Sequence, residues 1–440
     1  MFGAGKSAHT LITYLLSNAK QNNWQLTIAD MNPKLINGKF QSEHLEVIEF
    51  SLENTELKET LIESSDIVIS MLPARFHKEI MQTALKFSKN MITPSYDSKE
   101  MNDIREEVKE KGLIFLNELG LDPGIDHMSA MEIIHRIQEA GDKITAFESF
   151  TGGLIAPESD NNPWHYKFTW NPRNVILAGA GGSVKFLHNG KFKYIPYNKL
   201  FERTEEIEIE GYGIFEGIAN RDSLKYIDIY GLYDVKTMYR GTLRRPPYSK
   251  AWSILVEIGA TDDSYKMEDT ENMTYREFMN TFLKFRKGDS IELKLAYYIN
   301  DDVDSEAMKL LKWVGLFENK KIGLKEASPA QVLQHLFEQK ISLEPGDKDM
   351  IVMRHLFKYG KNKVLTSSMV VIGDDDYNTA MAKTVGLPIG IATKLILNGE
   401  IEEKGVLMPM TKEIYEPILK ELQEYGIIFK EEISEITEEY

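Results

Sequence analysis

The chain has 440 residues, 42% of them hydrophobic, which is enough to form two or three domain cores. Its 52 basic and 68 acidic residues give a net charge of −16 with histidine neutral, so the overall field disfavours nucleic-acid phosphates and anionic membranes. The chain has no cysteine, which excludes disulfides, thiolate nucleophiles and cysteine-bound zinc. Its 9 histidines show no paired ligand spacing, so no metal site is expected.

Targeting and membrane signals are not apparent in the sequence. The N-terminus lacks a basic segment followed by an apolar core, and no uncharged apolar run approaches the roughly 20 residues that a membrane helix needs. We therefore expect a cytoplasmic protein that has neither a membrane nor a nucleic acid as its partner.

The opening stretch "MFGAGKSAHTLITYLL" has the spacing of a dinucleotide-binding loop followed by a helix. Gly3 permits the tight turn, Gly5 lets the backbone approach a pyrophosphate, and Ala8 lets the helix pack closely on its strand. The predicted cofactor contacts in this loop are Gly3, Gly5, Lys6, Ser7 and Ala8. Only two residues precede Gly3, so the first strand is expected to be shorter than the usual five or so residues.

A second strand is predicted at 26–29, and it ends in Asp30, at the distance from the glycines where such folds place an acid. A carboxylate there can accept hydrogen bonds from the ribose hydroxyls of adenosine. It would also repel a 2′-phosphate, so Asp30 favours NAD as the cofactor, with NADP as the other possibility. The alternative is a solvated acid at the end of a strand.

Two further strands are predicted at 66–73 and 113–120, with helical patterns at 76–88 and 98–111. Strands that alternate with helices indicate a parallel sheet, and ligands bind such sheets beyond the carboxyl ends of the strands. The N-terminal part is therefore predicted to be a Rossmann domain.

Three residues next to these strand ends are predicted to lie on the cofactor side. Leu72 and Pro73 close the strand at 66–73, and Asp122 follows the strand at 113–120. Asp122 also stands before Pro123, where aspartate is a good turn residue.

The rest of the chain predicts a second α/β domain with a mixed sheet, because its strands are longer and rich in aromatic residues. We place the boundary near Leu121. The Rossmann domain then takes 1–121, the second domain takes 122–266 and 340–375, and the charged, helical sequence at 267–339 forms a small all-α insertion.

Six segments carry a resemblance to a known family. They are "NELGLDPGIDHMSAMEII", "SFTGGLIAPESDNNPWHYKFTWNPRNVI", "ANRDSLKYIDIYGL", "RGTLR", "EPGDKDMIVMRH" and "TAMAKTVGLPIGIATKLILNGEI". Across essentially the whole chain they resemble saccharopine dehydrogenase of the L-glutamate-forming type, also called saccharopine reductase. The chain looks most similar to the dehydrogenase half of the bifunctional aminoadipic semialdehyde synthase, in which the second strand likewise ends in an acid and NAD is used.

The resemblance implies an architecture as well as an activity. Residues from about 376 to 440 would return to complete the Rossmann domain, and the second domain would bind substrate and form a homodimer. The implied reaction is the oxidation of the secondary amine of saccharopine to L-glutamate and 2-aminoadipate 6-semialdehyde, in lysine metabolism. One departure is Thr151, which stands where the family often has cysteine.

Saccharopine carries three carboxylates, and the chain has a dense arginine group at 219–249. Arginine can hold a carboxylate with two parallel hydrogen bonds and stays charged. Arg221, Arg240 and Arg244 are therefore the predicted substrate-carboxylate ligands. The alternative is a surface arginine paired with a neighbouring acid, such as Arg221 beside Asp222.

Oxidation requires the substrate amine to lose its proton, so a general base and a proton shuttle are expected. Asp126 and His127, just past the last strand, are the predicted pair, with Tyr96 of "TPSYDS" as a hydrogen-bonding partner. Asp126 could instead cap a helix that begins near Met128, and His127 could simply be packed or exposed.

The paired glycines Gly152 and Gly153 have two readings, a close approach of the backbone to the substrate or a turn. Two other functions also fit parts of the sequence. One is a carboxylated polyamine dehydrogenase of the same fold, although it would need fewer arginines. The other is a non-catalytic regulator that binds NAD without turnover.

Overall fold

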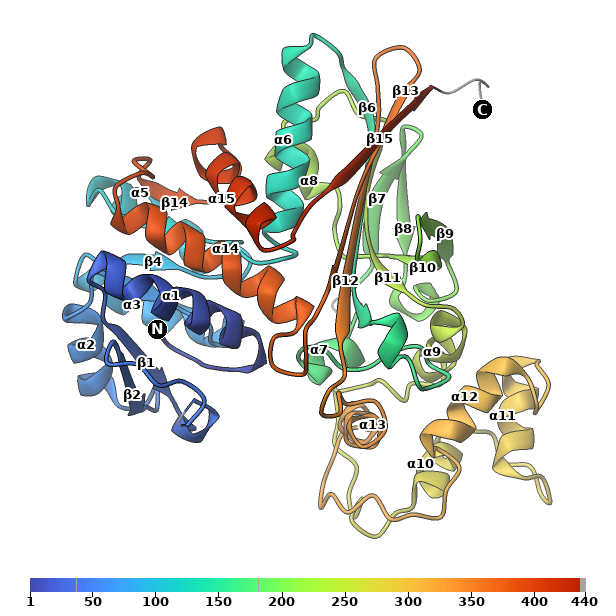
Figure 1. The fold of residues 1–440 in the computed structure, drawn as a ribbon. Helices are drawn as coiled ribbons and strands as arrows, with labels where there is room; N and C mark the ends of the chain where they lie inside the picture. Colours follow the sequence, from blue (N-terminus) through green and yellow to red (C-terminus); the bar gives the residue numbers. More distant parts are fainter. Residues whose placement is uncertain (37, 181, 436–440) are drawn as a thin grey trace. The chain divides into compact units, whose positions relative to one another are not determined.

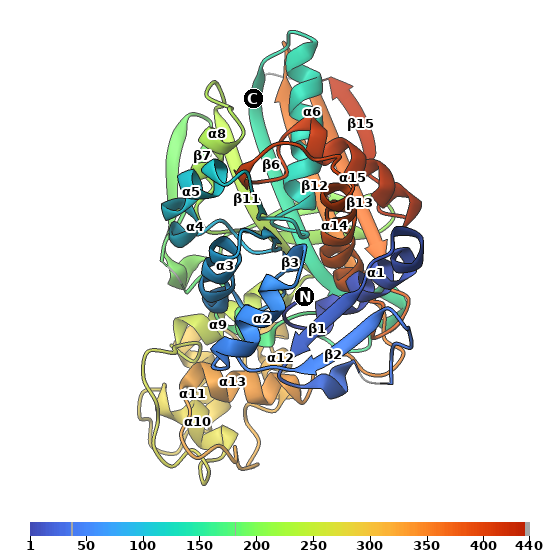
Figure 2. The ribbon, with the colours of Figure 1, turned by 90° about the vertical axis from the view of Figure 1, so that its left-hand side faces the viewer.

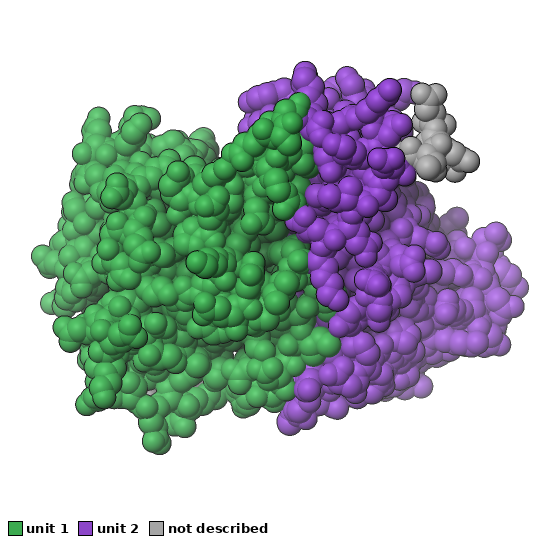
Figure 3. Space-filling model, turned by 45° about the horizontal axis from the view of Figure 1, so that its top comes forward, with its two compact units in different colours: residues 1–141, 369–429 green, residues 142–368, 430–440 purple. Residues whose placement is uncertain are grey.

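The computed structural model describes residues 1–36, 38–180 and 182–435. The chain forms two compact units, which Figure 3 colours separately. Unit 1 comprises Met1–Gly141 and Met369–Phe429, and unit 2 comprises Asp142–Ser368 and Lys430–Tyr440.

Unit 1 contains a parallel sheet. Its strands are β1 (Leu26–Asp30), β2 (Leu45–Glu49), β3 (Ile67–Ile69), β4 (Asn90–Ile92), β5 (Ile114–Leu116) and β14 (Gly405–Leu407). The strands β1 and β2 pair with each other, and β14, β5, β4 and β3 pair in that order. Phe2 joins the two sets by parallel bridges to Ala29 and Ser70. The spatial order β2, β1, Phe2, β3, β4, β5, β14 is that of a doubly wound Rossmann sheet, which confirms the predicted fold.

The first strand is reduced to Phe2, as expected from the two residues that precede Gly3. Around it, at the amino ends of the neighbouring strands, lies a cavity of about 380 Å³ whose lining includes Trp24, Thr27, Ser65 and Leu397. The backbone of Met1, Phe2 and Gly3 therefore joins the two sets of strands in unit 1.

Helices cover this sheet. They are α1 (His9–Asn22), α2 (Thr55–Glu63), α3 (His77–Lys86), α4 (Lys99–Asp103), α5 (Arg105–Glu110), α6 (Ile125–Glu139), α14 (Ala380–Leu397) and α15 (Lys412–Glu424), with short 3-10 turns at Lys6–Ala8, Pro33–Leu35 and Ala74–Phe76. By length and composition α14 could span a membrane, but 78% of it is buried in the structure. It runs beside α1 (Figures 1 and 2), and a side chain at Gly386 would come within 2.8 Å of the Leu11 nitrogen.

The observed unit boundaries differ from the predicted ones. Unit 1 extends past Leu121 to Gly141, because α6 packs on α15 and His135 Nδ1 lies 2.8 Å from the Tyr415 hydroxyl. The predicted C-terminal part of the Rossmann domain, 376–440, is also divided, since β15 (Lys430–Glu435) pairs with a strand of unit 2. Residues 436–440 lie outside the described part of the chain.

Unit 2 is built on a mixed sheet, which in the described residues has nine strands. Besides β15 they are β6 (Ile144–Ile155), β7 (Val184–His188), β8 (Lys191–Ile195), β9 (Thr204–Ile209), β10 (Gly213–Ala219), β11 (Thr237–Arg244), β12 (Asp349–Tyr359) and β13 (Lys363–Ile372). Parallel pairing of β6 with β11, next to antiparallel neighbours on both sides, makes the sheet mixed, as predicted.

The helices of unit 2 are α7 (Pro172–Ile176), α8 (Lys225–Ile229), α9 (Tyr248–Glu257), α10 (Tyr275–Thr281), α11 (Ile291–Ile299), α12 (Glu306–Val314) and α13 (Pro329–Glu338), with 3-10 turns at Pro157–Ser159 and Tyr197–Lys199. The segment predicted as an insertion, 267–339, contains α10 to α13 and no long strand of the sheet (Figure 1). Hydroxyl caps start these four helices, at Thr274, Ser290, Ser305 and Ser328.

Candidate active site

The glycine loop of unit 1 has the geometry that a dinucleotide needs. Gly3 has φ +90°, and a Cβ there would lie 3.0 Å from the backbone of Met71, so only glycine fits. A Cβ at Gly5 would meet no protein atom within 4 Å, which leaves room for a pyrophosphate beside the backbone. Ala8 is buried, and Lys6 and Ser7 form the more accessible start of the following turn.

The carboxylate of Asp30 is bound to this loop. One oxygen accepts a hydrogen bond from the Ala4 backbone nitrogen at 2.7 Å, and the other accepts from the Asn32 nitrogen at 2.8 Å. Asp30 is therefore held over the glycine loop and is not a merely solvated acid at a strand end.

The predicted residues at the strand ends surround the same loop and the turn that follows β5. The Leu72 side chain lies 3.2 Å from the Cβ position of Gly3, and Pro73 is exposed at the start of the next turn. Asp122 accepts a hydrogen bond from the Tyr96 hydroxyl at 3.3 Å. The structure thus gives Tyr96 a contact with Asp122, one of the predicted cofactor residues.

His77, which the sequence interpretation did not single out, joins the ends of β3 and β4. Its Nδ1 lies 2.8 Å from the Ser70 hydroxyl, and its Nε2 lies 2.6 Å from the Ser95 hydroxyl. Burial lowers the pKa of His77 to about 4. The imidazole is therefore neutral near pH 7 and acts as a clamp between two loops.

The turn from Gly120 to Gly124 fixes the start of α6. Gly124 has φ +146°, and a Cβ there would lie 2.1 Å from the Gly120 carbonyl oxygen. Helix α6 begins at Ile125, earlier than the predicted start near Met128, and Gly124 is the residue before it. Asp126 therefore lies inside the first turn of the helix, and the interpretation of Asp126 as the cap is wrong.

Three buried residues form what we call the acid–histidine cluster: Glu118, Asp126 and His127, with exposed fractions of 2%, 1% and 0%. His127 Nε2 lies 2.8 Å from Glu118 Oε2, and His127 Nδ1 lies 3.7 Å from Asp126 Oδ2. The other oxygen of Asp126 accepts a hydrogen bond from the Gly124 nitrogen at 2.7 Å. The ring thus lies between two carboxylates, both held by this short segment.

Glu118 also has an unusual backbone. Its φ of +55° is left-handed, which costs a non-glycine residue on the order of 1 kcal/mol or more. Its nitrogen donates to the Ser95 carbonyl at 2.9 Å, so the conformation is held by the neighbouring loop. No pattern in the sequence predicts this backbone conformation, and Glu118 is not among the predicted site residues.

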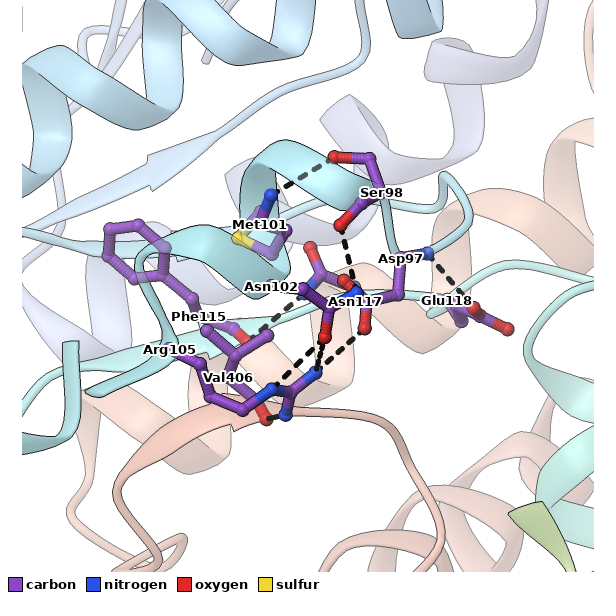
Figure 4. A network of polar contacts seen from close by, with 9 residues as sticks. All are labelled: Asp97, Ser98, Met101, Asn102, Arg105, Phe115, Asn117, Glu118 and Val406. Atoms are coloured by element: carbon purple, nitrogen blue, oxygen red, sulfur yellow. Dashed lines mark hydrogen bonds and ion pairs between the residues drawn. The ribbon is translucent and has the colours of Figure 1, made fainter. Parts of the chain in front are cut away.

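A polar network holds the far side of Glu118 (Figure 4). The Asp97 backbone nitrogen donates to Glu118 Oε1 at 2.9 Å, and the Asp97 carboxylate pairs with Arg105 at 2.7 Å. Arg105 also donates to the Val406 carbonyl at 2.7 Å, which ties the network to β14. Burial raises the pKa of Asp97, and the charge of Arg105 opposes that shift.

In unit 2, two predicted substrate ligands share one side of β11, which we call the arginine face: Arg240 and Arg244. They are four residues apart on a strand, so their side chains point the same way about 13 Å apart. Both are buried, with 6% exposed. The Arg240 guanidinium lies 4.0 Å from the Tyr226 ring centroid. Arg221 is exposed in the loop after β10, and its neighbour Asp222 pairs with Lys185.

Arg244 is a buried guanidinium surrounded by aromatic rings. It lies 4.8 Å from the Tyr166 ring centroid and 5.4 Å from that of Tyr248, and it donates to the Leu243 carbonyl. Its Nε has no hydrogen-bond partner, and no carboxylate in the described part of the chain forms an ion pair with it. A buried cation in this state is suited to an anionic ligand.

The neighbouring strand β6 carries the paired glycines and Thr151. Both glycines lie inside the strand, so the turn interpretation is wrong. Thr151 pairs with Thr242 and therefore shares the arginine face with Gly153, two residues on. Gly152 points the other way, and a Cβ there would lie 2.8 Å from the Leu243 Cβ, so strand packing rather than a ligand explains it.

A second histidine that the sequence interpretation did not assign lies on the same face. His355 of β12 is fully buried and pairs across the sheet with Ser149 of β6. Its Nδ1 lies 3.0 Å from the Ser149 hydroxyl, and Ser149 is in register with Arg240. The arginine face is therefore lined by hydroxyl and imidazole groups as well as by guanidinium groups.

Comparisons with known proteins agree on one family. The model of the saccharopine dehydrogenase C-terminal domain matches residues 120–427, and that of the saccharopine dehydrogenase NADP binding domain matches 1–116. Among solved structures, apo saccharopine dehydrogenase (L-Glu forming) from Saccharomyces cerevisiae superposes with a TM-score of 0.88 at 30% identity, over 98% of both chains. Homospermidine synthase from Legionella pneumophila, 12% identical with a TM-score of 0.55, shares the fold.

Two curated relatives differ in how much of their length they share with this chain. Saccharopine dehydrogenase [NADP(+), L-glutamate-forming] from Schizosaccharomyces pombe is 32% identical over 98% of both chains. Mitochondrial alpha-aminoadipic semialdehyde synthase from Mus musculus is 33% identical over 98% of this chain but only 47% of its own length. The chain thus spans about half the length of the animal synthases it matches.

Proposed function

The chain belongs to the saccharopine dehydrogenase family, and we propose that it oxidises saccharopine to L-glutamate and 2-aminoadipate 6-semialdehyde in lysine metabolism. The observation that carries this proposal is Arg244, a buried guanidinium that has aromatic neighbours and no carboxylate partner in the described residues. A substrate with three carboxylates supplies the anion that such a group needs.

The arginine face binds the substrate in this proposal. Arg244 holds one carboxylate, and Arg240, on the same side of the strand, holds a second toward the other end of an extended ligand. Thr151, whose buried hydroxyl has no hydrogen-bond partner among the described residues, offers a further donor on the same face. Arg221, exposed at the end of β10, remains a predicted ligand for the third carboxylate.

The acid–histidine cluster handles the proton. When bound, the nicotinamide cofactor supplies the hydride acceptor. The secondary amine must first release its proton, and we assign this proton to Asp126 Oδ2, the oxygen that faces His127. His127 Nδ1 then receives the proton from Asp126. Loss of this proton and of a hydride from the adjacent carbon leaves an imine on the substrate. Water adds to the imine, and cleavage of the carbon–nitrogen bond releases the two products.

For the cofactor we propose NAD in preference to NADP. Asp30 places a carboxylate over the glycine loop, where it would accept hydrogen bonds from ribose hydroxyls and repel a 2′-phosphate. Residues 31–50 contain no arginine to pair with such a phosphate. The family model and the fungal relatives are named for NADP, so this preference would distinguish the chain from them.

The first experiment is to follow absorbance at 340 nm on adding saccharopine, with NAD and with NADP, at mildly alkaline pH. We expect turnover with NAD and a higher kcat/KM than with NADP. Asp30→Ala should raise the KM for NAD roughly 10-fold, which is the effect expected from losing one charged hydrogen bond. It should also reduce the ratio of kcat/KM with NAD to kcat/KM with NADP. The matched control Glu46→Ala removes an exposed acid of β2 and should change neither the KM for NAD nor the preference for NAD over NADP.

The outcomes separate the competing ideas. A wild-type preference for NADP would refute the cofactor assignment but keep the reaction. Oxidation of a carboxylated polyamine instead of saccharopine would point to the related dehydrogenase. Tight NAD binding without turnover of either substrate would favour a non-catalytic regulator.

We also propose that the chain acts in the cytoplasm as a homodimer. The support is the absence of cysteine and an edge strand, β15, whose residues are exposed and include Ile433 with 65% of its surface accessible. The net charge of −16 argues against nucleic-acid and anionic-membrane partners. Mass measurement in solution tests the dimer.

A further inference from the structure

Glu118 is costly to keep where it is. It is a carboxylate with 2% of its surface exposed, in a left-handed backbone conformation that a glycine would adopt without strain. Strain and buried charge that persist together at one residue usually mark a functional role for that residue.

The contacts of Glu118 point to His127. An ionised Glu118 can only accept hydrogen bonds, so across the 2.8 Å contact it would hold the proton of His127 on Nε2. With the proton on Nε2, the neutral ring keeps its lone pair on Nδ1. That atom faces Asp126 Oδ2 at 3.7 Å, so the tautomer suits proton transfer from Asp126.

The other end of Glu118 is fixed independently of His127. Its Oε1 accepts from the Asp97 nitrogen, and Asp97 is held by Arg105, which is bound to the Val406 carbonyl on β14 (Figure 4). The carboxylate is thereby anchored to the rigid sheet of unit 1. An anchored acceptor restricts both the rotation and the tautomer of the ring it contacts.

We propose that Glu118 is a positioning residue, which fixes His127 as the Nε2-protonated tautomer so that Nδ1 can take the substrate proton from Asp126. The part of this inference that concerns turnover rests on the proposed function. The part that concerns the tautomer does not depend on any substrate.

The first test reads the tautomer directly. Ring ¹⁵N chemical shifts of His127 are measured in the full chain labelled at histidine, and His127→Gln assigns the signal. The wild type should show a protonated Nε2 and an unprotonated Nδ1. Glu118→Ala should give averaged shifts of two tautomers, whereas Glu118→Gln, whose amide oxygen can still accept, should keep the wild-type pattern. An unchanged pattern in Glu118→Ala overturns the proposal.

The second test reads turnover. Glu118→Ala should lower kcat for saccharopine roughly 10- to 100-fold with little change in KM, and Glu118→Gln should recover most of that loss. The control Glu107→Gln changes a half-exposed acid of α5 and should behave as wild type. Loss of thermal stability in Glu118→Ala, with kcat and ring shifts unchanged, would show a merely structural role and overturn the proposal.

The two tests also separate the inference from the proposed function. If the wild type does not oxidise saccharopine but its ring shifts respond to Glu118→Ala as expected, the positioning role stands and the assigned reaction fails. If saccharopine is oxidised and the shifts do not respond, the reaction stands and the positioning role fails.

Discussion

The acid–histidine cluster of unit 1 and the arginine face of unit 2 are built in opposite ways. Glu118, Asp126 and His127 lie within ten residues of sequence. Their contacts include each other, the turn that carries them and, through Glu118, the backbone of the neighbouring loop at Asp97. Arg240 and Arg244 stand on a straight strand, and Arg244 is surrounded by rings and has no carboxylate partner in the described residues. One region is organised before any ligand binds, whereas the other has donors that a ligand would satisfy.

The largest effect on stability is expected from a backbone change beside the acid–histidine cluster, at Gly124. Gly124→Ala would place a Cβ 2.1 Å from the Gly120 carbonyl oxygen at a φ of +146°, so the turn must rearrange. We expect a loss of about 4 kcal/mol in the free energy of unfolding. Urea unfolding measures this loss, and exchange of the α6 amides locates it.

The matched control for that change is Gly141→Ala. Gly141 also has a positive φ, +80°, but a Cβ there meets nothing within 4 Å, so the cost should be only about 1 kcal/mol. Equal losses in the two variants would show that positive φ alone, and not the closed turn, sets the stability of this segment.

The next largest effect is expected at Arg244 of the arginine face, where a substitution should lower activity without lowering stability. Arg244→Leu removes a buried charge that has no acid partner in residues 1–36, 38–180 and 182–435, so the thermal stability should stay the same or rise. The kcat/KM for saccharopine should fall about 100-fold, equivalent to about 3 kcal/mol, because in the proposed function Arg244 is the partner of a substrate carboxylate. Steady-state kinetics with saccharopine varied measures the change.

Arg245→Leu is the control for Arg244→Leu. The Arg245 guanidinium lies 4.2 Å from the Phe215 ring centroid and donates to the Tyr212 carbonyl, away from the arginine face. It should keep kcat/KM within a few-fold of wild type. A similar loss in both variants would mean that general charge, and not a carboxylate contact at Arg244, explains the effect.

The same contrast explains what the sequence could predict. The glycine loop and Asp30 follow local spacing, so the sequence could single them out together, and the structure joins them through the hydrogen bond from the Ala4 nitrogen to Asp30. Residue type singled out Arg240 and Arg244, but their common side of β11 required the structure. The left-handed backbone of Glu118 has no such signal, because a glutamate rarely adopts it. Its contact with His127 therefore required the structure.

Long-range packing accounts for the other differences. The start of α6 is set by Gly124, whose conformation depends on close contact with Gly120, and so Asp126 is not a cap. The extent of unit 1 depends on α6 meeting α15, a contact between residues 280 positions apart. Gly152 is small because Leu243 of another strand occupies its side. Periodicity along a chain carries no information about such neighbours.

The smallest expected effect is a dependence of the stability of unit 1 on pH, which arises from His77 and should be absent from the arginine face of unit 2. Burial lowers the pKa of His77 to about 4, from 6.5, so between these values the unfolded state binds more protons than the folded state. The contribution of neutral His77 to the free energy of unfolding is therefore fully present above pH 6.5 and is lost as the pH falls toward 4. Between pH 7 and pH 5 the loss should be about 2 kcal/mol.

Hydrogen exchange of the β3 and β4 amides measures that loss, since His77 bonds to Ser70 and Ser95 at the ends of these strands. His77→Gln should lower stability at pH 7 but remove most of its dependence on pH, whereas His44→Gln, at a partly exposed histidine of the same unit, should keep the wild-type dependence. Amides of β11 should not follow the titration of His77, because the arginine face belongs to unit 2. If exchange of the β11 amides followed the titration of His77 equally, the two regions would unfold together. They would then differ in their local hydrogen bonds but not in their stability.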